Sequence, residues 1–162
     1  MTQSVLAREV EFGVSVVEEG HESLHTQSVA KDPFVLALAP DHPLARRQRM
    51  RWDELAPWKP VSLGSSSANR KRMDAELAMV GMEPPWFDEV DHLSTMIGFL
   101  RHGGAIGVLP RLALDAGAHD LTVRPLVSPV IHREIGLIRR KETELSRPGQ
   151  WLWQLLARSL TS

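Results

Sequence analysis

The segment Leu63 to Arg70, LGSSSANR, places three hydroxyl side chains between a glycine and a predicted helix. Hydroxyl donors, the unpaired N–H groups of a first helical turn and the positive end of the helix dipole converge at such a turn. Serine is also a common N-cap residue, so a purely structural role stays open. The turn is a candidate anion site, with Ser65, Ser66 and Ser67 as its donors.

His92 stands at a second predicted junction between a strand and a helix, directly after Asp91. It could donate a hydrogen bond to a ligand or form one locally, and the sequence favours neither. A catalytic triad of Ser66, His92 and Asp91 is disfavoured, because adjacent side chains on a strand point to opposite faces. The GxSxG turn of many hydrolases is also absent from the sequence. We therefore expect no enzyme activity.

The glycines of HGGAIGVLP, residues 102–110, follow a predicted helix and precede a predicted strand. A phosphate-binding loop needs the reverse order, a strand and then a helix. The glycines are better explained as a helix cap and a tight turn. The chain has no cysteine, and we expect neither a metal site nor a cofactor.

The composition describes an ordinary globular chain of 162 residues, with 43% hydrophobic and 24% charged residues and a net charge of −1. This balance does not favour nucleic acid or an anionic membrane as a partner. No apolar run approaches the ~20 residues that span a bilayer. The N-terminal segment does not have the pattern of a secretory signal. We expect a cytoplasmic protein that makes no membrane contact.

Hydrophobic periodicity predicts strands that alternate with helices, which favours an α/β fold with a parallel sheet. The segment from Glu18 to Asp32 is polar and is predicted as a loop with at most an edge strand. The predicted strands are 10–17, 33–40, 59–64, 85–90, 105–110, 121–126 and 133–140. The residues before position 10 are predicted to form the end of a helix. Further helices are predicted at 52–56, where the helix is short, and at 65–81, 92–103, 111–117 and 146–160.

Spacing within these helices predicts which side chains face the core. In the helix after the serines, Met73, Leu77 and Val80 share a face, and Gly81 is placed as the C-terminal cap. In the next helix, Ile97 and Leu100 are expected to face inward and Gly103 to end the helix. In the last helix, we expect Ser146 to cap the N-terminus, and the apolar stripe comprises Trp151, Leu152, Leu155 and Leu156.

Six segments, taken in order, resemble the effector-binding domain of LysR-type transcriptional regulators. They are REVEFGVSVV, DPFVLALAPDHPLARR, WDELAPWKPVSLGSSSANR, GFLRHGGAIGVLPRLAL, LTVRPL and REIGLIRRKETELSRPGQWLWQLL. The DHPLA turn, the GVLP strand and the RPL segment are the most recognisable of these. The resemblance covers essentially the whole chain.

The resemblance implies an α/β, two-lobed, periplasmic-binding-protein-like fold of type II. Residues 1–38 and 135–162 would form lobe I and residues 39–134 lobe II, with PFVLALAP and HREIGLI as the strands that cross between them. Members of the family begin with a helix-turn-helix domain, a linker helix and an opening strand–helix–strand. These elements are not found in this sequence, so we expect the first lobe to be incomplete.

The function implied is that of an effector-sensing regulatory domain without catalytic activity. The alternative is a solute-binding protein of a transport system, which shares the fold. The effector is expected to be a small carboxylate, monoanionic or partly apolar, held in the cleft between the lobes. DNA would be bound only through the missing N-terminal domain, and we expect a homo-oligomer. By position, the expected effector-binding residues are Ser15, Ser65, Ser66, Ser67, His92, Leu93 and Pro110.

Overall fold

A computed structural model describes residues 1–17 and 20–160, and the chain forms two compact units. Unit 1 comprises Met1–Asp32 and Arg133–Ser162, and unit 2 comprises Pro33–His132. The division falls inside one strand, β2 (Leu24–Leu38), and near the start of another, β8 (His132–Arg140). The lobe boundaries expected from the family, after residues 38 and 134, lie a few residues from these divisions.

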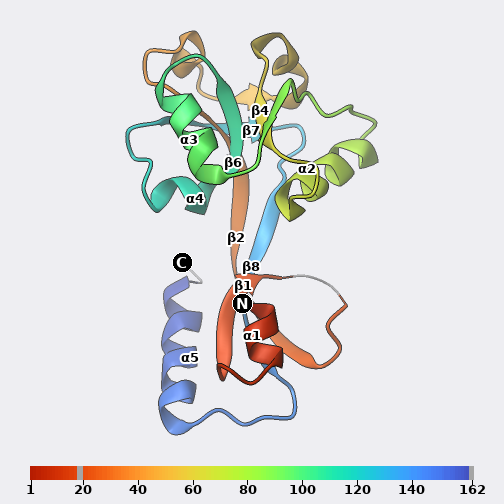
Figure 1. The fold of residues 1–162 in the computed structure, drawn as a ribbon, viewed down its shortest axis with the longest axis vertical. Coiled ribbons are helices and arrows are strands. Elements are labelled where there is room, and N and C mark those ends of the chain that lie inside the picture. Colours follow the sequence, from red (N-terminus) through yellow and green to blue (C-terminus); the bar gives the residue numbers. More distant parts are fainter. Residues whose placement is uncertain (18–19, 161–162) are drawn as a thin grey trace. The chain divides into compact units, whose positions relative to one another are not determined.

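Unit 1 is a small antiparallel sheet with one helix on each face. β1 (Phe12–Val16) pairs with β8, and β8 in turn lies beside β2. The short α1 (Thr2–Leu6) covers one face of the sheet and α5 (Arg147–Leu160) covers the other (Figure 1). Because alternate side chains of a strand point to opposite faces, β8 contributes Ile138 to the α1 side and its neighbour Leu137 to the α5 side.

The packing of α5 differs from the apolar stripe expected from the sequence. Ser146 caps the helix as predicted, since its Oγ accepts a hydrogen bond from the backbone N–H of Gly149 at 3.2 Å. Of the predicted stripe, however, only Leu156 packs against the sheet. The side chains that cover the sheet are Trp153, Leu156, Ala157 and Leu160, while Trp151, Leu152 and Leu155 are exposed.

The reason is that α5 has two apolar faces, so its periodicity does not say which of them is buried. Trp153 decides the choice through specific contacts with the sheet. Its Nε1–H donates to Gln27 Oε1 at 2.9 Å, and its ring meets that of Phe12 edge-on, with 5.5 Å between the centroids. These contacts orient the helix and leave the other apolar face uncovered within the described chain.

Unit 2 contains a mixed sheet, not the parallel sheet that we predicted. The C-terminal part of β2 runs antiparallel to two neighbours, β6 and β7, whereas β4 lies parallel to β5 and β6. Local periodicity shows that these segments are strands but carries no information about their relative direction. The strands are β3 (Met50–Arg51), β4 (Val61–Leu63), β5 (Asp88–Val90), β6 (Ile106–Pro110) and β7 (Thr122–Val127).

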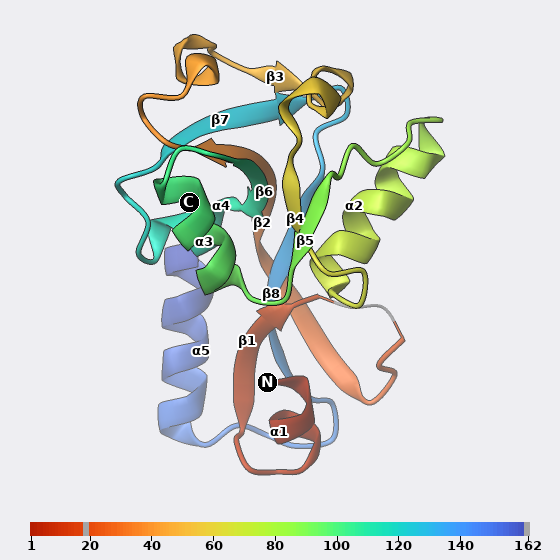
Figure 2. The same ribbon diagram turned by 45° about the horizontal axis from the view of Figure 1, so that its top comes forward.

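Helices cover both faces of this sheet. α2 (Ala68–Met79) lies on one side, and α3 (Leu93–Arg101) and α4 (Arg111–Asp115) lie on the other (Figure 2). The core on the α2 side includes Trp52, Met73 and Leu77, and the opposite core includes Met96, Leu100 and Leu114. The predicted helix at 52–56 is replaced by two 3-10 turns, Trp52–Glu54 and Ala56–Trp58, and a third covers Pro43–Arg46.

The ends of α2 and α3 are as predicted from the sequence, whereas their inner faces are only partly so. Gly81 and Gly103 follow their helices with φ of +72° and +74°, which confirms both as C-terminal glycines. Val80 is not on the inner face of α2, because the helix ends at Met79 and the Val80 side chain is 53% exposed. Leu100 is fully buried as expected, while Ile97 is only partly buried.

The polar segment predicted as a loop is largely part of the long strand β2, which begins at Leu24. Glu18 and Glu19, also in that segment, lie outside the described residues. The prediction was wrong because the segment has only sparse apolar residues, Leu24 and Val29, and both are buried against β8 or the helices. Within residues 1–17 and 20–160, no helix combines the length and the apolar character needed to cross a bilayer.

Candidate functional site

Two strand ends of unit 2 bring most of the predicted site residues together. Leu63 of β4 is opposite Val90 of β5 in parallel register, and the backbone N–H of Gly64 donates to the Val90 carbonyl at 3.1 Å. The serine turn, residues 64–67, and His92 therefore follow neighbouring strands at the same end. β6 is also parallel to β4 and ends at Pro110, so Ser65, Ser66, Ser67, His92, Leu93 and Pro110 all lie at this end of the sheet.

The serine turn leads directly into α2. The Ser67 N–H donates to the Gly64 carbonyl at 2.9 Å, and the Lys71 N–H donates to the Ser67 carbonyl at 3.0 Å, which opens the helix. Ser67 is the N-cap residue, with extended backbone angles, but its side chain makes no capping hydrogen bond. Ser65 and Ser66 are exposed. The Ser67 hydroxyl therefore does not cap α2.

The start of α3 repeats this arrangement beside the first. His92 is the N-cap residue, and its carbonyl accepts from the Met96 N–H at 3.1 Å. Its imidazole is exposed and makes no capping hydrogen bond. The two helix N-termini thus present their first-turn N–H groups at neighbouring strand ends, where partial positive charge gathers. A carboxylate or a similar small anion is the chemical group that such a site would stabilise.

Acidic side chains next to the turn limit how much negative charge it would accept. Arg70, in the first turn of α2, is already paired: its Nε donates to Asp74 at 2.8 Å and its Nη1 to Glu89 at 2.8 Å. Its side chain is only 12% exposed, and the guanidinium lies over the Trp86 ring, 5.2 Å from the centroid. The Trp86 Nε1–H also donates to Asp74, at 2.7 Å.

This cluster of Arg70, Asp74, Trp86 and Glu89 was not singled out from the sequence. The spacing of Arg70 and Asp74, four residues apart on a helix, was the only local signal of their pairing. Glu89 and Trp86 reach the cluster through the fold alone. The cluster carries one positive and two negative charges, so it adds no net positive charge beside the serine turn.

Ser15 is the one predicted site residue in unit 1. It is half-buried in β1, opposite Gly136 of β8. The remaining predicted residues belong to unit 2.

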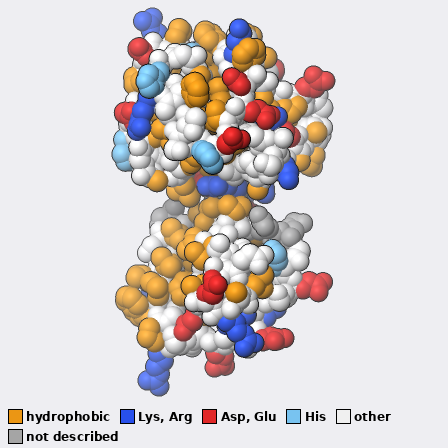
Figure 3. All heavy atoms as spheres, viewed as in Figure 1, with side chains coloured by type: hydrophobic (Ala, Val, Ile, Leu, Met, Phe, Trp, Pro, Cys, Tyr) orange, Lys and Arg blue, Asp and Glu red, His pale blue; other side chains and the backbone are white. Residues whose placement is uncertain are grey.

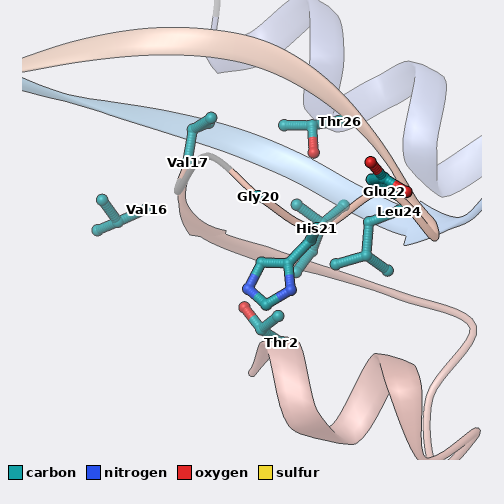
Figure 4. A pocket seen from close by; sticks show the side chains of 9 residues that line it. Thr2, Val16, Val17, Gly20, His21, Glu22, Leu24 and Thr26 are labelled. Atoms are coloured by element: carbon teal, nitrogen blue, oxygen red, sulfur yellow. The ribbon is translucent and has the colours of Figure 1, made fainter.

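The recesses within the individual units include three with volumes of about 320–370 Å³. One, in unit 1, is lined by Thr2, His21 and Thr26 among others, and Figure 4 shows the His21 ring beside Thr2 at the start of α1. The second includes His25 and Gln150 of the same unit, and the third includes Phe87 of unit 2. None of these three recesses is lined by a predicted effector-binding residue. Among the described residues, no group of three or more His, Asp or Glu side chains is arranged to hold a metal ion.

The fold is that of the type II periplasmic-binding-protein class. Residues 1–161 match the LysR substrate binding domain family, and the chain belongs to that family. Over 155 residues it is 39% identical to an uncharacterized HTH-type transcriptional regulator, YbhD, of Escherichia coli, covering 95% of this chain and 49% of the relative. It is 29% identical to YfeR of Shigella flexneri over 95% of the chain and 50% of the relative. The chain thus spans about half the length of these curated relatives.

Solved structures of the family share the fold at low sequence identity. The effector binding domain of QuiR in complex with shikimate superposes with a TM-score of 0.78 at 18% identity, over 98% of this chain and 76% of that domain. The effector binding domain of BenM with benzoate gives a TM-score of 0.79 at 17% identity, over 99% of this chain and 76% of the other. Full-length CbnR complexed with target DNA gives 0.78 at 17% identity, over 99% of this chain and 54% of the other.

Proposed function

We propose that this chain is the effector-sensing part of a LysR-type transcriptional regulator and that it binds a small monocarboxylate. The observation that carries the proposal is the pair of neighbouring helix N-termini in unit 2, at α2 and α3, with Ser67 and His92 as N-cap residues whose side chains make no capping bond. The positive ends of the two helix dipoles and the exposed hydroxyls favour a carboxylate at this position. The family match supports this role over that of a transport solute-binding protein.

The charge of the proposed effector follows from the residues around the serine turn. Arg70 is already bonded to Asp74 and Glu89, so it is not available as a clamp for a second carboxylate. Asp91 stands beside Gly64 and would repel a dianion, because its Oδ1 lies 4.0 Å from the position that a Cβ on Gly64 would take. A single carboxylate on an apolar body fits these conditions better than a dicarboxylate. The ligands of the QuiR and BenM complexes, shikimate and benzoate, each carry a single carboxylate.

The predicted contacts of the effector are assigned by position. Ser65, Ser66 and Ser67 would donate hydroxyl hydrogen bonds, and His92 would donate from its imidazole. Leu93 and Pro110 would contact the apolar part of the effector. Ser15 belongs to unit 1, and its participation remains a prediction from the family resemblance.

Calorimetric titration with benzoate, benzamide and succinate tests the proposal. We expect benzoate to bind. Benzamide, which lacks the charged acceptor, and succinate, whose second carboxylate Asp91 would repel, should each bind at least about tenfold more weakly. Ser66→Ala and His92→Ala should each weaken benzoate binding by a similar factor. Ser159→Ala, a change on α5 in unit 1, is the matched control and should have no effect. Equal affinity for benzoate and benzamide would contradict the anionic assignment, and unchanged binding by the two site variants would contradict the site.

We also propose that specific DNA binding resides outside this chain, in the remaining half of the longer relatives. The chain is near neutral, with a net charge of −1, so it has little of the charge that non-specific DNA affinity requires. A gel-shift titration of the 162-residue protein against promoter DNA should show no sequence-specific complex at physiological salt. A complex that survives competition by unrelated DNA would refute the proposal.

A further inference from the structure

A recess at the start of α5 lies entirely within unit 1 and is separate from the strand-end site. Its volume is about 370 Å³, and its lining comes from β2, from β8, from the loop that joins β8 to α5 and from the first turns of α5. All of these residues belong to unit 1, whereas the serine turn and His92 belong to unit 2. The charged and polar groups at its wall therefore define a second candidate site, independent of the first.

Arg139 supplies a positive charge at this recess. Its side chain points to the face of the sheet that α5 covers, because it stands two residues after Leu137, which packs beneath that helix. The guanidinium lies over the Trp153 ring, 6.0 Å from the centroid. Its Nη1 donates to the carbonyls of Arg140 and Thr143, at 3.3 and 3.1 Å. The ring and the two carbonyls hold the guanidinium in one orientation, so little of its freedom remains to be lost on binding.

The other N–H groups of Arg139 are left for a ligand. Within residues 1–17 and 20–160, Nε and Nη2 make no hydrogen bond, and no Asp or Glu side chain forms an ion pair with this arginine. The residue is partly buried. Nε–H and Nη2–H lie side by side in the planar guanidinium, and together they can donate two parallel hydrogen bonds to one carboxylate. A fixed, partly buried guanidinium without an acidic partner in this part of the chain is suited to holding a carboxylate from solution.

Glu144 supplies a negative charge at the same recess. It belongs to the loop before α5, its side chain is exposed, and its carboxylate has no hydrogen bond or ion pair within the described part of the chain. The two opposite charges thus border one recess without being paired to each other. On the face of unit 1 that Figure 3 shows, basic and acidic side chains are interspersed, so this side of the unit carries no broad field of one sign. A dianion would be repelled by Glu144, whereas a ligand with one charge of each sign can satisfy both groups.

Amide and imidazole side chains also line the recess. Gln150 and Gln154 stand on the flank of α5 next to it, and His25 comes from β2, with its ring 6.1 Å from that of Trp153. Nε2 of Gln150 donates to the Leu145 carbonyl at 3.0 Å, which leaves its Oε1 as an acceptor. An apolar group placed against these side chains would remove them from water without pairing them, which costs free energy. The lining therefore favours a ligand that has a polar group besides its two charges.

We propose that this recess binds a small zwitterionic α-amino acid with a polar, uncharged side chain. Its carboxylate accepts hydrogen bonds from Nε and Nη2 of Arg139, and its ammonium group lies toward Glu144. Its side chain contacts Gln150, Gln154 and His25. The volume of about 370 Å³ falls within the ~300–1,000 Å³ that is typical of small-molecule sites. The site is additional to the proposed effector site, because it takes a different class of ligand in a different unit.

Calorimetric titration with L-glutamine and two analogues tests the ligand class. Glutaramate is L-glutamine without its α-ammonium group, and 4-aminobutanamide is L-glutamine without its α-carboxylate. We expect L-glutamine to bind, and 4-aminobutanamide to bind at least about tenfold more weakly, because it cannot accept from Arg139. Glutaramate should bind about threefold more weakly, because the pair that it loses, with the exposed Glu144, contributes less. Equal affinity for all three compounds would overturn the proposal.

Substitutions at the two charges assign the roles within the recess. Arg139→Lys keeps the positive charge but removes the planar fork, and it should weaken L-glutamine binding about tenfold. Glu144→Gln should remove the preference for L-glutamine over glutaramate. Arg158→Lys and Glu142→Gln change exposed residues of unit 1 that do not line the recess, and they are the matched controls. Ser66→Ala should leave L-glutamine binding unchanged, so this proposal and that of the benzoate site in unit 2 can fail separately.

The indole N–H signal of Trp153 gives a measurement on the wild-type chain that does not depend on how well a variant folds. Trp153 lines the recess, and its Nε1–H donates to Gln27 at 2.9 Å. In a two-dimensional ¹H–¹⁵N spectrum, L-glutamine should shift this signal and leave those of Trp52 and Trp86, in unit 2, in place. The absence of L-glutamine binding, binding that does not move the Trp153 signal, or unchanged affinity in Arg139→Lys would each refute the assignment.

Discussion

Arg133 and Asp32 form an ion pair at the division between the two units. The Nε of Arg133 donates to Oδ2 of Asp32 at 2.8 Å; the Asp32 side chain is fully buried and that of Arg133 is 17% exposed. Asp32 is the last residue of the first segment of unit 1, and Arg133 is the first residue of its second segment. The pair therefore ties together two segments that are 101 residues apart in the sequence, at the point where both leave unit 1.

Arg133→Met should destabilise the protein strongly, because it leaves the buried Asp32 carboxylate without this partner. Removing one member of a buried pair costs about 3–5 kcal/mol. Urea denaturation gives the loss in the free energy of unfolding. Arg47→Met is the matched control: Arg47 and Glu54 form a pair at 2.7 Å that is 52% and 36% exposed, and we expect a loss below about 1 kcal/mol. Equal losses in the two variants would show that burial of the Asp32 pair has no energetic consequence.

Gly136→Ala should be poorly tolerated. A Cβ at this position would lie 2.6 Å from Cγ2 of Val17 and 3.1 Å from the backbone oxygen of Gln27, so a strand would have to shift. We expect a loss of roughly 1–3 kcal/mol, as for other overpacked sites. Gly98→Ala, in α3, meets nothing within 4 Å and should instead raise stability by about 1 kcal/mol through helix propensity. Thermal unfolding of the two variants should show shifts of opposite sign.

His42 should make stability depend on pH in the mildly acidic range. Its Nδ1 accepts a hydrogen bond from the Leu44 N–H at 3.2 Å, which caps the 3-10 turn Pro43–Arg46. Burial lowers the pKa of His42 below its ordinary value and outweighs the opposing effect of Asp41. The folded state therefore binds the proton less readily than the unfolded state, and stability falls as the pH decreases through the ordinary histidine range.

His42→Asn keeps a capping acceptor but does not titrate in this range. We expect the loss of stability between about pH 7 and about pH 5 to be smaller in this variant than in the wild type, by at most about 1 kcal/mol, the contribution of one capping bond. Chemical denaturation at the two pH values gives this difference. If the two proteins lost the same stability, His42 would not be responsible for any of the pH dependence.

Asp74→Ala should loosen the cluster of Arg70, Asp74, Trp86 and Glu89 beside the serine turn. The carboxylate of Asp74 accepts hydrogen bonds from Arg70 and from the Trp86 indole, and both would lose this acceptor. We expect a loss of about 2 kcal/mol, since hydrogen bonds to charged groups are worth more than neutral ones. Asp115→Ala removes an exposed pair with Arg111 at the same helical spacing and should cost less than about 0.5 kcal/mol. Similar losses would mean that the part-buried contacts of Asp74 contribute no more than an exposed surface pair.

The sequence by itself determined the local features of this protein. Gly81 and Gly103 were predicted as helix C-terminal glycines, because a left-handed conformation after a helix favours glycine whatever the tertiary context. The cap at Ser146 is equally local, since it depends on a hydroxyl three residues before the N–H that it accepts. The family followed from the order of short motifs, which is a property of the sequence alone.

The tertiary structure decided everything that depends on residues far apart in the chain. Periodicity identified β2 and β6 as strands but could not show that they run antiparallel, since strand direction is set by chain connections. The stripe of α5 was assigned to the wrong face, because a helix with two apolar faces buries the one that finds partners, here Trp153 against Phe12 and Gln27. The placement of His92 beside the serine turn required the parallel register of Leu63 and Val90, which no local pattern contains.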